Sequence, residues 1–309
     1  MQIPFKIVGF LFLGVIWGMA DSLQQTDINA KSPWAAHLDA EKLRTSPLGR
    51  FLEETAGFER VVQLENSLKE KLSLDPDAIE GVTLFGSGKE WKETALLIRG
   101  DLESVNLEAF LLVKGSLGQI HQGPEWHGKP LYFAKHSGKE LVGGTSIQAV
   151  RDSLEVLDDP KGKSWQGVEL TDRAEGKLAS SLAVLALDMK RIGTELDFEA
   201  DLTRAAKNAW FTIGSHDEDV EVSVMIHSTD AEGLLFLQNQ WAFFAAMMMS
   251  GQEYPAEVRE MVGAVKIETH DHWMTATVSA PPEKIAKFLE SLKPMFRDEP
   301  KEVKLPKKD

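Results

Sequence analysis

A small group of histidine and carboxylate residues near the C-terminal end of the sequence could bind a metal ion. Glu268, His270 and His272 alternate along the chain. In one continuous strand, alternate side chains point to the same face. Two imidazoles and a carboxylate form a ligand set suited to zinc. However, His270 and Asp271 fall where a hairpin turn is expected, and this turn would break the shared face. We therefore favour an exposed turn over a metal site, and we predict no cofactor.

A second cluster, His216 followed by Asp217, Glu218 and Asp219, could supply oxygen ligands for calcium. Calcium loops need alternating oxygen ligands and a glycine that permits a sharp turn. Here the apolar residue Val220 interrupts the pattern, and the chain continues directly into a strand. A solvated hairpin tip is the favoured interpretation.

Catalytic motifs are absent from the sequence. It contains no G-x-S-x-G, P-loop, G-x-G-x-x-G or H-E-x-x-H motif. It also contains no cysteine, which excludes disulfides, thiolate metal sites and cysteine nucleophiles. Asp39 and Asp188 occupy matching positions, but each precedes a helical pattern and is expected to cap a helix. We therefore predict no catalytic residue.

The best candidate for a contact surface is an apolar segment that runs from Leu234 to Met249. Apart from the polar turn Gln238 to Gln240, it is apolar on all sides, and Gly251 is expected to end it. A helix of this kind is usually buried, and burial is favoured here. Alternatively, one face is exposed and contacts a partner protein, a lipid or an apolar ligand. The candidate contact residues are Trp241, Phe243, Phe244, Met247 and Met248.

These features lie in a chain that repeats one plan. The stretch Phe85–Asp101 recurs without a gap as Ile213–Thr229. Each copy indicates a strand, a turn, a second strand and a helix cap, so the first copy predicts a helix beyond Ser104. The alternate positions of the second strand differ between copies, with Leu97 and Arg99 in the first, and we expect them to be exposed.

The repeat predicts an α+β fold of two tandem related units, each an antiparallel or mixed sheet with helices packed against it. The expected divisions are a signal peptide, a first unit, a polar connection, a second unit and a disordered charged tail, at residues 1–20, 21–159, 160–180, 181–293 and 294–309.

The N-terminus has the three-part pattern of a secretory signal peptide. Lys6 precedes an apolar run, and Gly18 and Ala20 place small residues before a cleavage site after Ala20. The alternative is a membrane anchor. The run to Ala20 has about fourteen residues, whereas a span needs about 20. We expect an exported protein, periplasmic or extracellular, with no transmembrane span in the mature chain.

The formal net charge of −14 argues against nucleic acid as a partner, because binding to phosphates needs a basic surface. These features together favour an exported, non-catalytic binding or protein-interaction module whose partner is a protein or an apolar ligand. The alternative is an extracytoplasmic hydrolase, possibly metal-dependent, whose carboxylates and histidines are brought together by folding.

Overall fold

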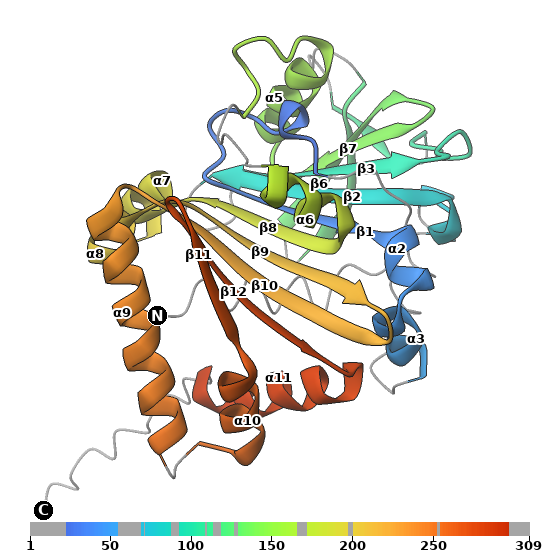
Figure 1. Cartoon of the computed structure of the whole chain (residues 1–309). Coiled ribbons are helices and arrows are strands. Elements are labelled where there is room, and N and C mark those ends of the chain that lie inside the picture. The colour runs from blue at the N-terminus through green and yellow to red at the C-terminus, as the bar shows by residue number, and fades with distance from the viewer. Residues whose placement is uncertain are drawn as a thin grey trace, which may run out of the picture.

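The computed structural model describes residues 23–54, 69–70, 72–87, 93–108, 110–113, 119–126, 129–165, 172–196, 200–251 and 254–296. The predicted signal peptide and the charged tail beyond residue 296 lie outside the described residues. Helices and strands are mixed along the chain, and the described strands form one large antiparallel sheet (Figure 1). The predicted combination of helices with an antiparallel sheet is confirmed at this level.

Among the described residues, the first half of the chain contains helices beside a group of seven strands. Its elements are η1 (Gln25–Asp27), β1 (Trp34–Asp39), α2 (Ala40–Thr45), α3 (Pro47–Glu54), η2 (Pro76–Ala78), β2 (Ile79–Ser87), β3 (Glu93–Gly100), β4 (Leu111–Leu112), β5 (His121–Trp126), β6 (Lys129–Ser137), β7 (Glu140–Gly144) and α5 (Ile147–Asp158).

The described part of the second half has five strands and several helices. Its elements are α6 (Asp172–Ser180), β8 (Ser181–Asp188), α7 (Met189–Leu196), α8 (Ala200–Ala205), β9 (Ala206–His216), β10 (Asp219–Ser228), α9 (Ala231–Ser250), α10 (Ala256–Ala264), β11 (Lys266–His270), β12 (Trp273–Ala280) and α11 (Pro282–Phe296).

The strands of both halves join at the centre of the sheet, where β1 pairs antiparallel with β8. Across the described residues the strand order is β11-β12-β10-β9-β8-β1-β2-β3-β7-β6-β5-β4. Trp34 lies opposite Leu187, and Leu38 lies opposite Ala183. The two predicted units therefore contribute to a single continuous sheet.

Local capping chemistry starts the helices that follow the two central strands. The carboxylate of Asp39 accepts a hydrogen bond from the backbone N–H of Lys42 at 2.9 Å. Asp188 accepts from the backbone N–H of Arg191 at 3.1 Å. Each aspartate satisfies a donor that has no partner within the helix, so their predicted capping role is confirmed.

The prediction of a helix beyond Ser104 is wrong. The described residues from Asp101 to Phe110 are irregular and lead to β4. The backbone N–H of Asn106 bonds to the carbonyl of Leu72, so this segment pairs with a distant part of the chain. Leu102, with Val105 and Leu107, is buried in a core cluster shared with β2, β3, β6 and β7. The apolar residues that suggested a helix are therefore spaced by their packing within a loop.

The expectation that one side of the repeated strands is exposed is also wrong. Leu97 and its counterpart Met225 are both buried. In the first half, η1 and α5 pack over β3. In the second half, α6 reaches over the sheet, and Lys177 on α6 contacts Ser223 of β10. The region predicted as a polar connection contains this helix, so the sheet carries packed side chains on both faces.

Candidate functional site

The three candidate metal ligands lie at the end of an edge hairpin. Glu268 and His270 belong to β11, and His272 lies in the turn that leads to β12. All three are exposed, and the Nε2 atom of His270 lies 3.2 Å from a carboxylate oxygen of Asp271. In the part of the chain that the structure describes, no three histidine, aspartate or glutamate side chains come close enough to hold a metal ion together.

The acidic cluster at the other hairpin likewise lies in solvent. Asp217 and its neighbour His216 are exposed at the tip between β9 and β10, with Nδ1 of the histidine 3.3 Å from the carboxylate. Glu218 points to a different partner and forms an ion pair with Arg50 at 2.7 Å. The side chains of this cluster therefore do not converge on a common point.

Helix α9 lies along one side of the molecule, beside β11 and β12 (Figure 1). Asp230 caps its first turn by accepting a hydrogen bond from the N–H of Gly233 at 2.8 Å. Gly233 is needed there, because a Cβ atom would lie only 2.6 Å from the carbonyl oxygen of Ala205 on α8. At the other end, Gly251 ends the helix as predicted. Contacts with α8 and α10 thus hold α9 at both ends.

One side of α9 is buried. Leu237 is 2% exposed and packs in a cluster with Met274 of β12. Met248 is 3% exposed and packs against Val258 and Val262 of α10. These two side chains fix the orientation of the helix on the protein.

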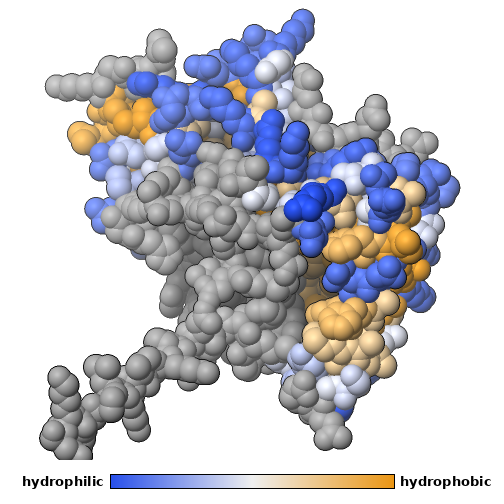
Figure 2. Space-filling model, turned by 90° about the vertical axis from the view of Figure 1, so that its left-hand side faces the viewer, coloured by the Kyte–Doolittle hydropathy of each residue, from blue (hydrophilic) through white to orange (hydrophobic). Residues whose placement is uncertain are grey.

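The opposite side of α9 is exposed and apolar, so the favoured interpretation of complete burial is wrong. Five large apolar side chains are 39 to 70% exposed, and Phe243 is the most exposed of them; they are Leu235, Phe243, Phe244, Met247 and Met249. Trp241 is half-buried, and its ring centroid lies 5.7 Å from that of Phe244. Figure 2 views the molecule from the side of α9 and shows apolar residues gathered at the lower right.

The apolar side of α9 is also uncharged. From Gly233 to Ser250 the helix carries no acidic or basic residue. The polar groups on its exposed side are neutral, with the amides of Asn239 and Gln240 open to solvent. No described helix is both long and apolar enough to cross a bilayer. This surface can remove apolar area from water on contact and form amide hydrogen bonds, and it has no group suited to chemistry.

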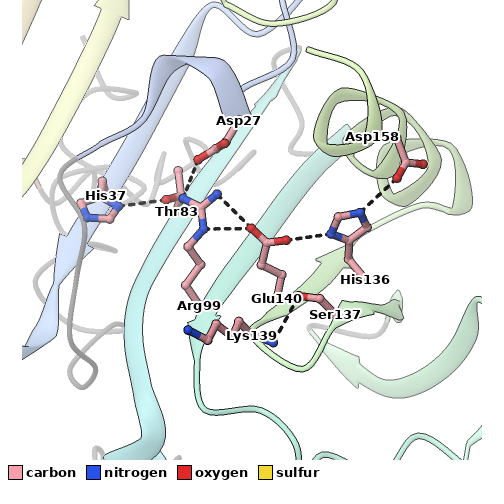
Figure 3. Close-up of polar contacts among 9 residues, drawn as sticks. All are labelled: Asp27, His37, Thr83, Arg99, His136, Ser137, Lys139, Glu140 and Asp158. Atoms are coloured by element: carbon pink, nitrogen blue, oxygen red, sulfur yellow. Dashed lines mark hydrogen bonds and ion pairs between the residues drawn. The ribbon is translucent and has the colours of Figure 1, made fainter.

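A polar network links five elements of the first half, namely η1, β3, β6, β7 and α5 (Figure 3). Arg99 on β3 forms an ion pair with Asp27 of η1 at 2.5 Å. Its Nε and Nη2 atoms donate to one carboxylate oxygen of Glu140 on β7, at 3.2 and 3.1 Å. The other oxygen of Glu140 lies 2.7 Å from Nδ1 of His136, and Nε2 of His136 lies 3.1 Å from Asp158 at the end of α5.

These ionisable groups cross-link the elements that carry them. Both ring nitrogens of His136 face carboxylates, so the imidazole can satisfy both only as the doubly protonated cation. Burial lowers the pKa of His136, but the hydrogen bonds and charges of Glu140 and Asp158 raise it by more, so it lies above its ordinary value. A histidine held in this way has no free nitrogen for a substrate proton. The network therefore joins β3, β6, β7 and α5 without a catalytic base.

A partial signal for this network is present in the sequence. Glu140 follows His136 by four residues across a two-residue turn, so the pair could have been found from the hairpin. His136 is partly buried, and each of its ring nitrogens lies within hydrogen-bond distance of a carboxylate. Its contact with Asp158 depends on the packing of α5, which no local spacing reveals.

Lys177 and Ser223 form a pair of the kind that some hydrolases use, at 2.9 Å between Nζ and Oγ. However, Lys177 also pairs with Glu221 at 3.1 Å and donates to Thr277 at 3.3 Å. An ammonium surrounded by acceptors acts as a donor and cannot remove a proton from the serine. Ser223 is also completely buried. This cluster holds α6 on the sheet and offers no access to a substrate.

A small cavity lies between α5 and the ends of β2 and β3. Its volume is about 40 Å³, and Asn29, Lys31, Phe85, Glu93 and Asp152 are among the residues that line it. Sites for organic ligands usually have volumes of about 300 to 1,000 Å³. This cavity has room for water molecules but is too small for a drug-sized or cofactor-sized ligand.

No protein-family model matches the chain, and no curated protein sequence is similar to it. Among solved structures, "Structure of crystal form I of TP0453" is similar, with 11% identity, a TM-score of 0.44, and 88% of this chain and 99% of that chain covered. Crystal form IV of TP0453 gives 12% identity, a TM-score of 0.42, and coverage of 87% and 97%. Similarity of this degree does not identify a function.

Truncation of a buried side chain of α9 should affect the free energy of unfolding much more than truncation of an exposed one. We expect Leu237→Ala to lower the free energy of unfolding by about 2 to 5 kcal/mol, because it leaves a cavity under the helix. Phe243→Ala should change it by no more than about 0.5 kcal/mol, since the ring is largely in solvent. Urea unfolding followed by circular dichroism would measure both. A large loss of stability in Phe243→Ala would mean that the exposed side is covered in solution.

The network around Arg99 predicts a stability that depends on pH. Because the pKa of His136 is raised in the folded protein, its contribution is complete below about pH 6.5, the ordinary value. That contribution is lost as the pH rises through the folded pKa. We expect the free energy of unfolding to decrease above pH 6.5 more steeply in the native protein than in His136→Gln, as measured by urea unfolding between pH 5.5 and 8.5.

The matched control for this experiment is His270→Gln, which changes an exposed hairpin histidine at the other end of the sheet. It should leave the native pH profile unchanged. The contribution of Glu140 to stability has the opposite pH dependence. Burial raises the pKa of Glu140, but its hydrogen bonds with His136 and Arg99 lower it by more. Its contribution to the free energy of unfolding is therefore lost as the pH falls below 4.5, the ordinary value. Equal slopes for native protein and His136→Gln would argue against the bridging role of His136.

Proposed function

We propose that this chain is an exported, non-catalytic interaction protein that binds an apolar surface of a partner through the exposed side of α9. The observation that carries this proposal is the group of five large apolar side chains exposed on one helix. Isolated exposed apolar residues are common on proteins, whereas contiguous apolar patches mark interaction sites. The absence of charge between Gly233 and Ser250 further supports contact with an apolar surface.

The proposed contact residues divide according to burial. Phe243 and Met247 are exposed and are proposed to touch the partner directly, with Phe244 and Trp241 at the edge of the contact. Methionine and aromatic side chains suit this role because they adapt to irregular surfaces and offer large contact areas. Met248 is buried against α10, so its part is to anchor the helix.

We further infer that the two halves arose from one plan. Outward from the centre, the strand order β8-β9-β10-β12-β11 in the second half is matched by β1-β2-β3-β7-β6 in the first. In both halves the later strand of the last hairpin (β12 or β7) lies next to the third strand, and the earlier strand of that hairpin (β11 or β6) lies outside it. This shared order supports a common origin. Helix α9 follows β10 at the position where the first half has the irregular segment after β3, so the contact surface belongs to the second unit.

Export of the chain rests on the N-terminal sequence, which lies outside the described residues. Expression of the full chain in a bacterium with the Sec machinery should yield periplasmic protein whose sequence starts at Asp21. Intact-mass analysis and N-terminal sequencing would measure this. As a control, Ala20→Arg places a large charge directly before the proposed cleavage site and should block cleavage. A native protein retained in the cytoplasm with Met1 intact would contradict the proposal.

The binding surface can be tested with the apolar dye bis-ANS on the mature chain. We expect the double variant Phe243→Ser with Met249→Ser to bind at least twofold less dye than the native protein, because it removes two of the most exposed side chains of α9. The matched control is Leu111→Ser with Leu112→Ser, which changes an exposed apolar pair on β4 and leaves α9 intact. If both double variants bind dye like the native protein, α9 is not an apolar binding surface.

A further inference from the structure

We propose that the exposed side of α9 docks an α-helix of a partner protein, and that the apolar stripe of this helix is bordered by lysine or arginine. This inference rests on the proposed function and specifies the partner. It is carried by the spacing of the exposed residues of α9 and by the charges on the elements that surround it.

The exposed residues form a straight stripe at helical spacing. Leu235, Asn239, Ala242, Ala246 and Met249 follow one another at intervals of three or four residues, and all are exposed. Residues at this spacing lie on one face of a helix. The small alanines in the middle let a second backbone approach closely, while larger side chains flank them. The surface therefore has a groove between larger side chains, into which the side-chain ridge of another helix can pack.

A helical partner fits this surface better than an extended one. The backbone groups within α9 are satisfied by its own hydrogen bonds, so an added strand would find no ladder to join. A helix brings its own backbone hydrogen bonds and needs only side-chain contacts. The exposed amides of Asn239 and Gln240 can then pair with polar side chains of the partner.

The charges around α9 are mainly acidic. On α8, α10, β11, and α9 with its cap, the acidic residues are Asp201, Asp230, Glu232, Glu257, Glu260 and Glu268, and the basic residues are Arg204, Arg259 and Lys266. Of the acids, Glu260 is paired with Lys284 of α11 and Asp201 with Arg204. Glu232 lies on the exposed stripe, one turn before Leu235. A partner with basic residues beside its apolar stripe would complement this acidic border.

Two other occupants fit less well. A second copy of this chain would bring the same acidic border and a net charge of −14 against itself. An anionic membrane surface would repel the acids, and interfacial helices normally carry lysine or arginine on their polar face.

The experiment uses three fluorescein-labelled peptides of 18 residues and the mature chain. The first peptide is an amphipathic helix with leucine at positions i, i+3, i+4 and i+7 and lysine at the borders. In the second, glutamate replaces every lysine, and in the third, serine replaces every leucine. Binding is measured by fluorescence anisotropy in 50 mM and 200 mM NaCl, against the native protein, Leu235→Ser with Phe243→Ser, and the control Leu111→Ser with Leu112→Ser.

We expect the leucine–lysine peptide to bind at least tenfold more tightly than either other peptide. The substitutions in α9 should weaken its binding at least tenfold, the control substitutions less than twofold, and the higher salt concentration several-fold. The inference is overturned if the glutamate or serine peptide binds equally well, or if the α9 substitutions have no effect.

Two further measurements identify the other occupants. Sedimentation equilibrium would reveal self-association that the α9 substitutions abolish, and co-sedimentation with phosphatidylcholine vesicles would reveal lipid binding. Either result, without tighter binding of the leucine–lysine peptide, would replace the helical partner. If bis-ANS binding depends on α9 but this peptide does not bind, only the identity of the partner fails and the proposed function remains.

Discussion

The antiparallel pairing of β1 with β8 is the interaction on which the rest of this structure depends. It joins strands from the two halves of the chain at the centre of the sheet, with Trp34 opposite Leu187 and Leu38 opposite Ala183. Because the sheet is continuous across this pair, the other strands extend outward from it on both sides. The helices then cover both faces, so even the alternate positions of strands such as β3 and β10 are packed. The charged groups placed there must therefore be paired.

This constraint explains why two charged side chains packed against the sheet have structural roles. Arg99 sits on a covered face and is neutralised by Asp27 and Glu140. Lys177 lies over the second half of the sheet, where it forms an ion pair with Glu221 and donates hydrogen bonds to the hydroxyl groups of Ser223 and Thr277. In each case the polar groups satisfy one another and hold a covering segment in place. Helix α9 differs, because its side from Leu235 to Met249 is apolar, uncharged and open to solvent.

Local features of the fold could be predicted from the sequence, whereas coverage of surfaces could not. The caps at Asp39 and Asp188 and the end of α9 at Gly251 follow from the chemistry of residues that are close in the sequence. Alternation along β3 indicated a strand but not which of its sides are covered, because that depends on the packing of η1 and α5. For α9, composition indicated burial on all sides. The exposure of Phe243 follows from where α8 and α10 hold the helix, and no spacing within α9 encodes this.

The central strand pair also has a consequence for how the chain acquires its structure. Strands β1 and β8 belong to segments far apart in sequence, and the entropy of closing so long a loop must be overcome before their hydrogen bonds form. Each half can assemble its own strands earlier, and its innermost strand is then an open edge with unpaired backbone groups. The correct partner of each edge is in the same molecule, but a neighbouring copy offers an identical one. Folding of this protein is therefore a competition between joining its own halves and exchanging them with another molecule.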